Sequence, residues 1–190
     1  MALYTGKGDN GTTKTFGCDQ GRISKSSEIP EALGTLDELN SYLGLCKARA
    51  RELENFGVMV GKKTYAVSAL LREVQENLFI VQAEVAGAPK KIRKPKVTKV
   101  ELIVNTIEKQ IPPIVSFSIV GGTELSALLD VARTLSRRAE RRVVAVHEGG
   151  LRKISDSTRA YLNRLSSLLF ALARLANAKA GVAEENPSYR

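Results

Sequence analysis

The sequence predicts an all-α protein, a single domain in which five helices form a bundle. Its 190 residues suit one compact domain with a full core. Hydrophobic residues make up 43% of the chain, whereas aromatic residues make up 5% and tryptophan is missing, so aliphatic side chains must fill the core, as they do between packed helices. Apolar residues also recur at three- and four-residue spacing in four long segments, which is the period of an amphipathic helix.

Residues 1–29 are rich in glycine, threonine and serine and lack a sustained period, so we expect a loop. The first helix is expected over 30–54, because Pro30 suits a first turn and one apolar seam follows it. That seam comprises Ala32, Leu36, Leu39, Leu43, Cys46 and Leu53. The second helix is expected over 63–86 and ends at Gly87. Its seam comprises Val67, Leu70, Val74, Leu78, Val81 and Val85.

Residues 88–99 are expected to form an exposed basic connection, with a solvated linker as the default interpretation and a dedicated anion site as the alternative. Its cations are Lys90, Lys91, Arg93, Lys94, Lys96 and Lys99. Thr98 is expected to cap a shorter helix over 98–110, which Pro112 and Pro113 prevent from continuing. Its apolar residues are Leu102, Ile103 and Ile107.

The apolar run 114–120 precedes two glycines and has no second strand to pair with, so it is expected to be a buried loop. A fourth helix is expected over 123–147, with Thr123 as its cap, and a fifth over 156–181. The fifth helix presents an apolar face made by Leu162, Leu165, Leu169, Leu172 and Ala176. These limits divide the chain into a loop (1–29), a helical bundle (30–181) and a C-terminal tail (182–190).

An arginine run on the fourth helix, from Ala132 to Arg142, is the most informative feature of the chain. Arg133, Arg137 and Arg141 lie at i, i+4 and i+8, so they form one charged stripe. A separate apolar stripe comprises Leu125, Leu128, Ala132, Leu135, Ala139 and Val146. Packing of that stripe would hold the guanidinium groups in a fixed direction, which suits phosphate binding. The alternative is a solvated basic face.

Composition limits the classes of partner and the compartment. The formal charge of +9 favours a polyanion, which nucleic acid, an anionic membrane or a nucleoside triphosphate would satisfy. Cys18 and Cys46 lack metal-ligand spacing and are too few for a disulfide framework, so both are expected to be reduced thiols. The sequence shows neither a signal-peptide pattern nor a membrane-spanning stretch, and a cytoplasmic protein is expected.

The N-terminal segment contains Gly6, Gly8 and Gly11 in a G-x-G-x-x-G pattern. It lacks the preceding strand and following helix of a dinucleotide-binding unit, and it lacks the G-K-[ST] of a phosphate-binding Walker loop. Glycines still allow backbone N–H groups to approach an anion, and lysines and threonines surround them. The relevant side chains are Thr5, Lys7, Thr12, Thr13 and Lys14. A flexible tail is the alternative.

Four single residues are further candidates, each with an unremarkable alternative. Asp37 on the first helix is expected to pair with a cation such as one of the arginines, or to be an exposed acid. Asn163 suits a contact to a base or sugar, or a local cap. Phe117 suits either the core or the wall of a pocket for a flat apolar ligand. His147 is solitary and is interpreted as a surface or helix-end residue, not a metal ligand.

Five motifs together resemble one family, the PduO-type ATP:cob(I)alamin adenosyltransferases, and they occur in the family's order over nearly the whole chain. They are Tyr4-Thr5-x-x-Gly8-Asp9-x-Gly11, Ala32-x-Gly34-Thr35-x-Asp37-Glu38-Leu39, Gly121-Gly122, Ala132-Arg133-x-x-x-Arg137-Arg138-Ala139-Glu140-Arg141 and Leu162-Asn163-Arg164-Leu165-Ser166. The resemblance implies a ferritin-like five-helix bundle that assembles as a homotrimer. Each active site would lie between neighbouring subunits and would transfer the 5′-deoxyadenosyl group of ATP to reduced cobalt, leaving triphosphate.

The resemblance also implies roles for individual residues. The ATP contacts that it implies are Thr5, Gly6, Lys7, Gly8, Thr13, Lys14, Lys25, Arg137, Arg138, Glu140, Arg141 and Asn163. Asp37 and Arg133 match a pair that joins adjacent subunits and shapes the corrin pocket. Phe117 matches an aromatic residue that keeps the cobalt free of a lower axial ligand, and Tyr189 is expected to be a second aromatic residue there. Arg137, Asp37, Arg133 and Phe117 are thus the expected catalytic set.

This chemistry needs no side-chain nucleophile, because Co(I) itself attacks C5′. Catalysis would rest on positioning and on stabilising the triphosphate by cations and Mg²⁺, which is expected on the ATP phosphates and not on a side-chain cluster. Val120 and Ser167 stand where the family often has proline and aspartate. The basic segment 90–99 is also not explained by the family.

Two alternative functions stay open at this point. A basic helical protein that binds nucleic acid would show strong salt dependence and no nucleotide requirement, but the chain has no groove-recognition motif and few aromatic residues for base stacking. A carrier of nucleotide or corrinoid could keep the fold without the reaction. As an enzyme, the chain would have small-molecule substrates, a corrin reductase and an acceptor enzyme as partners, and neither nucleic acid nor a membrane.

Overall fold

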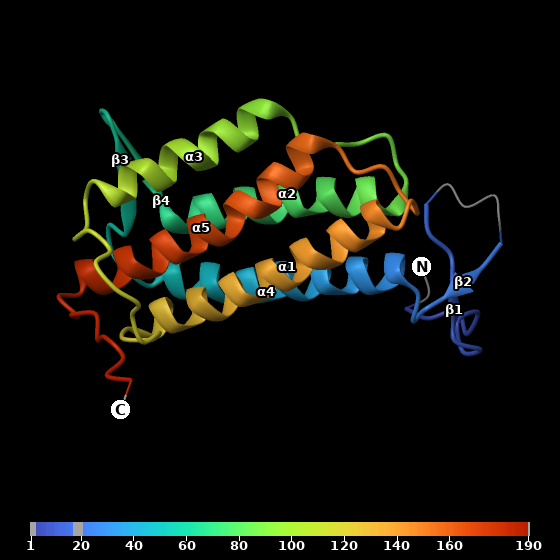
Figure 1. The fold of residues 1–190 in the computed structure, drawn as a ribbon, viewed down its shortest axis with the longest axis horizontal. Coiled ribbons are helices and arrows are strands. Elements are labelled where there is room, and N and C mark those ends of the chain that lie inside the picture. Colours follow the sequence, from blue (N-terminus) through green and yellow to red (C-terminus); the bar gives the residue numbers. More distant parts are fainter. Residues whose placement is uncertain (1–2, 17–20, 190) are drawn as a thin grey trace.

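The computed structural model describes residues 3–16 and 21–189, and it confirms an all-α fold with five helices (Figure 1). The helices are α1 (Glu28–Arg51), α2 (Val67–Ala86), α3 (Lys94–Glu108), α4 (Glu124–Glu148) and α5 (Asp156–Lys179). Two small antiparallel hairpins accompany them, β1 (Thr12–Thr13) with β2 (Ile23–Ser24), and β3 (Gly57–Val60) with β4 (Lys63–Ala66).

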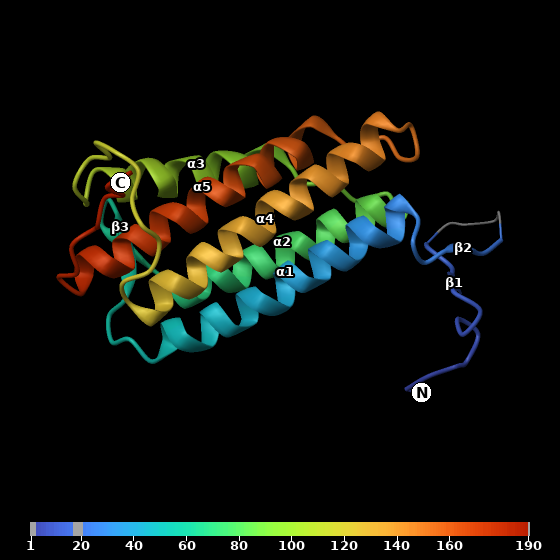
Figure 2. The same ribbon diagram turned by 60° about the horizontal axis from the view of Figure 1, so that its bottom comes forward.

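The four long helices lie side by side, and α3 runs along α5 (Figures 1 and 2). Helix α1 packs against α2 and α4, while α5 packs against α4 and α3. Every residue of the α2 and α5 seams predicted above is buried, as are all those of the α1 seam except Leu53. Burying one such leucine or valine stabilises the fold by about 1.5–3 kcal/mol. Within the described ranges, none of the helices has the length and apolar character needed to cross a bilayer.

Most helix ends follow their predicted signals. Pro30 lies in the first turn of α1, Gly87 ends α2 with a left-handed φ of 104°, and the Thr123 hydroxyl caps α4 by accepting from the Ser126 N–H at 3.2 Å. Helix α1 ends at Arg51, before the predicted end, so Leu53 lies outside it and is exposed. Cys46 is a buried free thiol, whereas Cys18 lies outside the described residues.

The predicted start of the second helix at residue 63 is wrong, because residues 63–66 form strand β4. They pair with β3 across a turn at Gly61, whose φ is +61°. Val58 is buried while its neighbour Met59 is 60% exposed, the alternation of a half-buried strand. The signals of this hairpin, β-branched residues on both sides of a glycine, are present in the sequence.

The third helix begins at Lys94, so Thr98 is not its cap and part of the basic segment 88–99 is helical. Pro95 lies in the first turn, where proline is tolerated because the missing N–H has no helical partner. Lys96 donates to Asn77 Oδ1 at 2.5 Å and Lys99 donates to Glu73 Oε2 at 2.5 Å, so both lysines tie α3 to α2. Leu102 of the predicted seam is 50% exposed.

The apolar segment 114–120 is a loop, as predicted, but its predicted burial is wrong. Val115 is 86% and Phe117 is 79% exposed. The loop and the C-terminal tail lie together at one end of the bundle, opposite the N-terminal hairpin (Figures 1 and 2). Apolar character alone does not distinguish a core segment from an exposed apolar patch, and such patches mark binding or association surfaces.

Candidate active site

A pocket of about 300 Å³ gathers four of the predicted ATP contacts. They are Arg137, Glu140 and Arg141 of α4 and Asn163 of α5. The rest of the lining comes from the last turns of α4, namely Val144, Ala145 and Glu148. Arg137 and Arg141 are one helical turn apart and both are exposed, so their guanidinium groups are available to an anion in this pocket.

The Asn163 amide is oriented by charged neighbours on both sides. Its Nδ2 donates to Glu140 Oε1 at 2.9 Å, and its Oδ1 accepts from Arg164 Nη1 at 2.6 Å. Arg164 Nε also donates to Glu101 Oε1 of α3 at 3.1 Å. This chain of hydrogen bonds holds the amide at the edge of the pocket. Arg164 was not among the predicted site residues, although it follows Asn163 directly in the motif.

The other arginines of α4 point elsewhere. Arg138 pairs with Glu38 of α1, and Arg142 Nη2 lies 3.5 Å from Glu31 Oε1 of the same helix. Both therefore face α1 and are outside the pocket lining. In the single chain the charge of Arg138 is already neutralised by Glu38. Its role in ATP binding stays a prediction.

Arg133 is held inside its own chain, away from Asp37. Its Nε donates to Asp130 Oδ1 at 3.0 Å, and its guanidinium carbon lies 5.8 Å from the centre of the Phe170 ring. Asp37 is exposed on α1. The predicted pairing of Asp37 with Arg133 is thus not made within one chain, and it stays a prediction for two neighbouring chains.

The N-terminal loop is a compact hairpin around its glycines. Gly6 and Gly11 have φ values of +66° and +78°, a region that glycine adopts without strain. Lys25 N donates to Gly11 O at 2.9 Å, and a Cβ at Gly8 would lie 3.0 Å from Lys25 Nζ. Gly8 and Lys25 therefore lie side by side, and their assignment to one anion site stays a prediction.

Within this loop, Thr5, Gly6, Lys7 and Lys14 are exposed and Thr13 is half-buried. Arg22 Nε donates to Thr12 Oγ1 at 2.6 Å and Arg22 Nη2 to Thr12 O at 2.6 Å, a contact that the sequence did not indicate. The loop extends away from the bundle at the end where α1 begins and α4 ends (Figures 1 and 2). The described residues that line the Arg137 pocket all come from α4 and α5, so residues 3–16 and 21–27 of the loop do not line it in one chain.

The two predicted corrinoid-contacting aromatic residues are both on the surface. Phe117 is 79% and Tyr189 is 81% exposed, so Phe117 does not belong to the core. They lie in the loop 112–123 and in the C-terminal tail, which meet at one end of the bundle (Figure 1). Exposed aromatic side chains at such a junction can form the wall of a binding surface.

The remaining titratable candidates belong to the framework. His147 Nδ1, in the last turn of α4, accepts from the Ile154 N–H at 3.2 Å and so stabilises the turn before α5, in agreement with a helix-end role. Burial raises the pKa of the Cys46 thiol to about 11. Across residues 3–16 and 21–189, the structure shows no cluster of three or more histidine, cysteine, aspartate or glutamate side chains that would hold a metal ion.

Comparisons with known proteins show what the chain is similar to. The family profile described as cobalamin adenosyltransferase matches residues 3–176. A corrinoid adenosyltransferase of Bacillus subtilis is 35% identical over 188 residues, covering 97% of this chain and 91% of its own. One of Citrobacter freundii is 37% identical over 180 residues, covering 91% of this chain and 93% of its own.

A solved structure shares the whole fold. It is that of a variant PduO-type ATP:corrinoid adenosyltransferase from Lactobacillus reuteri complexed with cobalamin and ATP. It superposes with a TM-score of 0.84 at 28% identity, covering 98% of this chain and 97% of that one. The sequence profile, the relatives and the fold lead to one conclusion: the chain belongs to the cobalamin adenosyltransferase family.

Proposed function

We propose that this chain is an ATP:corrinoid adenosyltransferase that moves the 5′-deoxyadenosyl group of ATP to the cobalt of cob(I)alamin, releasing triphosphate. The observation that carries the proposal is the pocket of α4 and α5. It presents Arg137, Arg141 and the oriented amide of Asn163 together, as a nucleotide with several phosphates requires. Relatives across the whole length of the chain are named for this activity.

The reaction needs positioning more than side-chain chemistry. The Co(I) electron pair attacks C5′, the C5′–O bond breaks, and its electrons leave on the triphosphate. Arg137 and Arg141 stabilise the charge that develops on this leaving group, because guanidinium groups held in place need no reorganisation. No proton has to move, which agrees with a pocket of arginines, glutamates and an amide.

Glu140 and Glu148 are the two carboxylates in the lining of this pocket. Mg²⁺ prefers oxygen ligands and is commonly held by substrate phosphates with one or two carboxylates, so these residues fit a metal on the ATP. When bound, the ion would neutralise part of the triphosphate charge. Glu140 would also keep Asn163 in place through their hydrogen bond.

A complete site would form between neighbouring subunits of a homotrimer. Two features support this part of the proposal. The N-terminal loop, with its lysines and threonines, extends beyond the end of its own bundle (Figure 2), and the described residues that line the pocket come from α4 and α5. Asp37 is exposed, and Phe117 and Tyr189 are more than three-quarters exposed, although each is expected to face a ligand or a subunit.

The charges of the bundle also bear on the nucleic-acid alternative. Arg138 and Arg142 pair with α1, and Lys96 and Lys99 bond to α2. These four cations each have a partner on a neighbouring helix, so their charge is less available to a phosphate backbone. Residues 1–190 as one adenosyltransferase domain, a cytoplasmic location, a corrin reductase and an acceptor enzyme as partners remain predictions.

The proposal is tested by incubating the protein with ATP, Mg²⁺ and chemically reduced cob(I)alamin in the absence of oxygen. We expect ATP-dependent formation of a light-sensitive cobalt–carbon bond, followed by absorbance, and one triphosphate per adenosylcobalamin. A protein that binds ATP and cobalamin but gives no product, with the cobalt shown to be reduced, would be a carrier and not an enzyme.

A further inference from the structure

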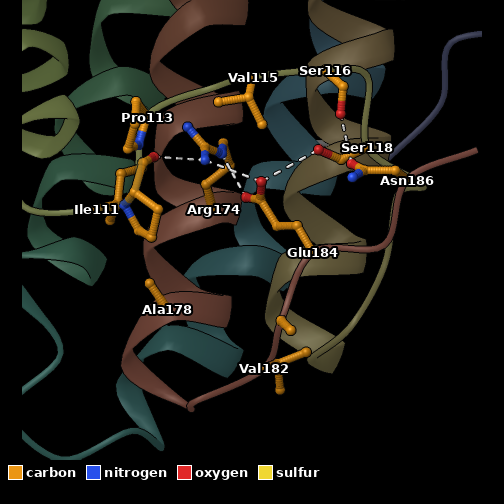
Figure 3. A pocket seen from close by; sticks show the side chains of 12 residues that line it. Ile111, Pro113, Val115, Ser116, Ser118, Arg174, Ala178, Val182, Glu184 and Asn186 are labelled. Atoms are coloured by element: carbon orange, nitrogen blue, oxygen red, sulfur yellow. Dashed lines mark hydrogen bonds and ion pairs between the residues drawn. The ribbon is translucent and has the colours of Figure 1, made fainter.

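One arginine outside the predicted site joins two surface segments. Arg174, near the end of α5, is only 7% exposed. Its Nη2 donates to the carbonyl of Pro112 at 2.9 Å, where the loop that carries Phe117 begins. Its Nε and Nη2 also donate to the two carboxylate oxygens of Glu184 in the tail, at 2.5 and 3.0 Å (Figure 3).

The loop and the tail make further contacts with each other beyond this arginine. Ser118 Oγ donates to Glu184 Oε2 at 3.3 Å, and Ser116 Oγ donates to Asn186 Oδ1 at 2.7 Å. The backbone N–H of Ile119 donates to the carbonyl of Glu185 at 2.7 Å. Figure 3 shows Ser116, Ser118, Arg174, Glu184 and Asn186 around one pocket of about 300 Å³. Residues 112–119 and 182–186 thus form one connected unit.

The same arginine is linked to Arg133 through an aromatic ring. The guanidinium carbons of Arg133 and Arg174 lie 5.8 and 6.0 Å from the centre of the half-buried Phe170 ring. Both distances are within the range of a cation–π contact. A chain of contacts therefore runs from Asp130 and Arg133 on α4, through Phe170, to Arg174 and the tail.

The Arg174 guanidinium is buried, whereas the side chain of Glu184 is 29% exposed. An ion pair with a solvent-exposed partner contributes little to the free energy of unfolding. The pair instead fixes the positions of its partners, because the planar guanidinium group donates hydrogen bonds in only a few directions. Here those partners are the two segments that carry Phe117 and Tyr189.

We propose that Arg174 is a positioning residue for the corrinoid side of the reaction. Through Pro112 and Glu184 it holds the Phe117 loop and the tail as a single wall, which sets where Phe117 and Tyr189 meet the corrin ring. The inference rests on the proposed function, since it assigns this wall to the corrinoid. Arg174 acts through these segments and does not touch the reacting atoms.

The test is Glu184→Gln, which removes the charge of the tail partner but keeps its shape. We expect the KM for cob(I)alamin to rise on the order of tenfold, because a hydrogen bond between charged groups is lost. The KM for ATP should stay within about twofold of the wild-type value, since the nucleotide pocket lies in the C-terminal half of α4, whereas the Phe117 loop leads into its N-terminal end. Glu184→Asp should recover part of the loss. Arg174→Lys should resemble Glu184→Gln, because an ammonium lacks the fork.

Glu76→Gln is the matched control. Glu76 accepts from Arg72 Nε at 2.9 Å in an exposed pair on α2, so it loses the same kind of bond away from the tail. Both KM values should match the wild type. Equal changes in the two KM values for Glu184→Gln would indicate a general structural effect and would overturn the positioning role.

A second readout does not depend on activity. The chain contains no tryptophan, so Ser188→Trp places a single fluorescent reporter in the tail. We expect its anisotropy to fall when Glu184→Gln is added and to stay unchanged when Glu76→Gln is added. An unchanged anisotropy together with wild-type KM values in an active Glu184→Gln protein would refute the inference. Loss of adenosyl transfer in the wild-type protein would instead refute the proposed function.

Discussion

The arginines of α4 differ in whether a carboxylate of the same chain pairs with them, and this difference supports different roles for them. Arg133 bonds to Asp130, and Arg138 and Arg142 pair with glutamates of α1. Arg137 and Arg141 instead face a pocket whose lining also contains the oriented amide of Asn163. A guanidinium that has no short ion pair across the bundle can give its full charge to a ligand. We therefore expect these two residues to bind the triphosphate.

Arg137→Ala should lower kcat/KM for adenosyl transfer by an amount equivalent to roughly 2–4 kcal/mol, the cost of removing one charge donor held in place for the transition state. Steady-state kinetics with varied ATP measure this. Arg142→Ala is the control on the same helix, because Arg142 faces Glu31 of α1 and should leave kcat/KM unchanged. Equal losses of kcat/KM in the two variants would contradict the assignment of Arg137 to the nucleotide and of Arg142 to α1.

Cys46 gives a prediction about pH. Burial raises the pKa of its thiol from 9.0 to about 11. Above pH 9 the unfolded chain loses this proton while the folded chain keeps it, so the contribution of the thiol to stability is complete below pH 9 and is lost as pH rises toward 11. Denaturant titrations at pH 8 to 11 should show a smaller decrease in the free energy of unfolding for Cys46→Ala than for the wild type. Parallel decreases would contradict the shifted pKa.

At the scale of elements, the entry into α4 depends on Asn177 of α5. Its Oδ1 accepts from the Thr123 N–H at 2.9 Å, and its Nδ2 donates to Gly121 O at 2.8 Å. Gly122 passes so close that a Cβ would lie 2.6 Å from Asn177 Oδ1, and its φ is +100°. Gly122 therefore serves a close approach of backbone to side chain, where the loop of Phe117 ends and α4 begins, whereas Gly121 meets nothing within 4 Å and is distinguished by its φ of +122°.

Gly122→Ala should destabilise the fold by about 1–3 kcal/mol, since it combines a strained backbone with a steric clash. Thermal and denaturant unfolding measure this. Gly44→Ala is the control, because Gly44 is helical and its added Cβ would meet only Gln75 Nε2 at an ordinary 3.6 Å. That variant should be as stable as the wild type or more so. If both substitutions had the same effect, the close approach at Gly122 would not matter.

At the scale of the molecule, the proposed ligand contacts lie at opposite ends. The N-terminal hairpin extends beyond one end of the bundle, whereas the Phe117 loop and the tail occupy the other (Figure 1). Arg137 is thirteen residues into α4 from Glu124, a distance of about 20 Å along the helix axis. Neighbouring subunits would have to supply the surfaces that one chain leaves open.

Mixed trimers test this directly. Arg137→Ala lacks a pocket arginine, and a second variant with Lys7→Ala and Lys14→Ala lacks the loop cations. If loop and pocket come from different subunits, co-expressed chains should form intact sites at about a quarter of the interfaces, as random pairing in a closed ring predicts. Activity should therefore exceed that of either parent. Mixtures no more active than the parents would place loop and pocket in the same subunit.

Much of the fold was predictable because helical periodicity is a local property. The seams of α2 and α5, the Thr123 cap and the end of α2 at Gly87 all follow from residues close in sequence. The hairpin of β3 and β4 and the start of α3 were not predicted. At the hairpin, strand signals around Gly61 competed with an apolar helical period. At the start of α3, Lys96 bonds to Asn77 of α2, a partner that lies far away in the sequence.

The sequence by itself determined the helical class, the buried seams of α2 and α5 and the placement of Arg137 and Arg141 on one stripe of a single helix. The assignment of Glu140 and Asn163 to the same site came from the resemblance to the family. Only the tertiary structure decided which arginines are neutralised, that the apolar segment 114–120 is exposed, and that Arg174 joins this loop to the tail. The physical reason is that the partner of a long charged side chain depends on which helix packs beside it, and the pattern of a single segment does not contain that information.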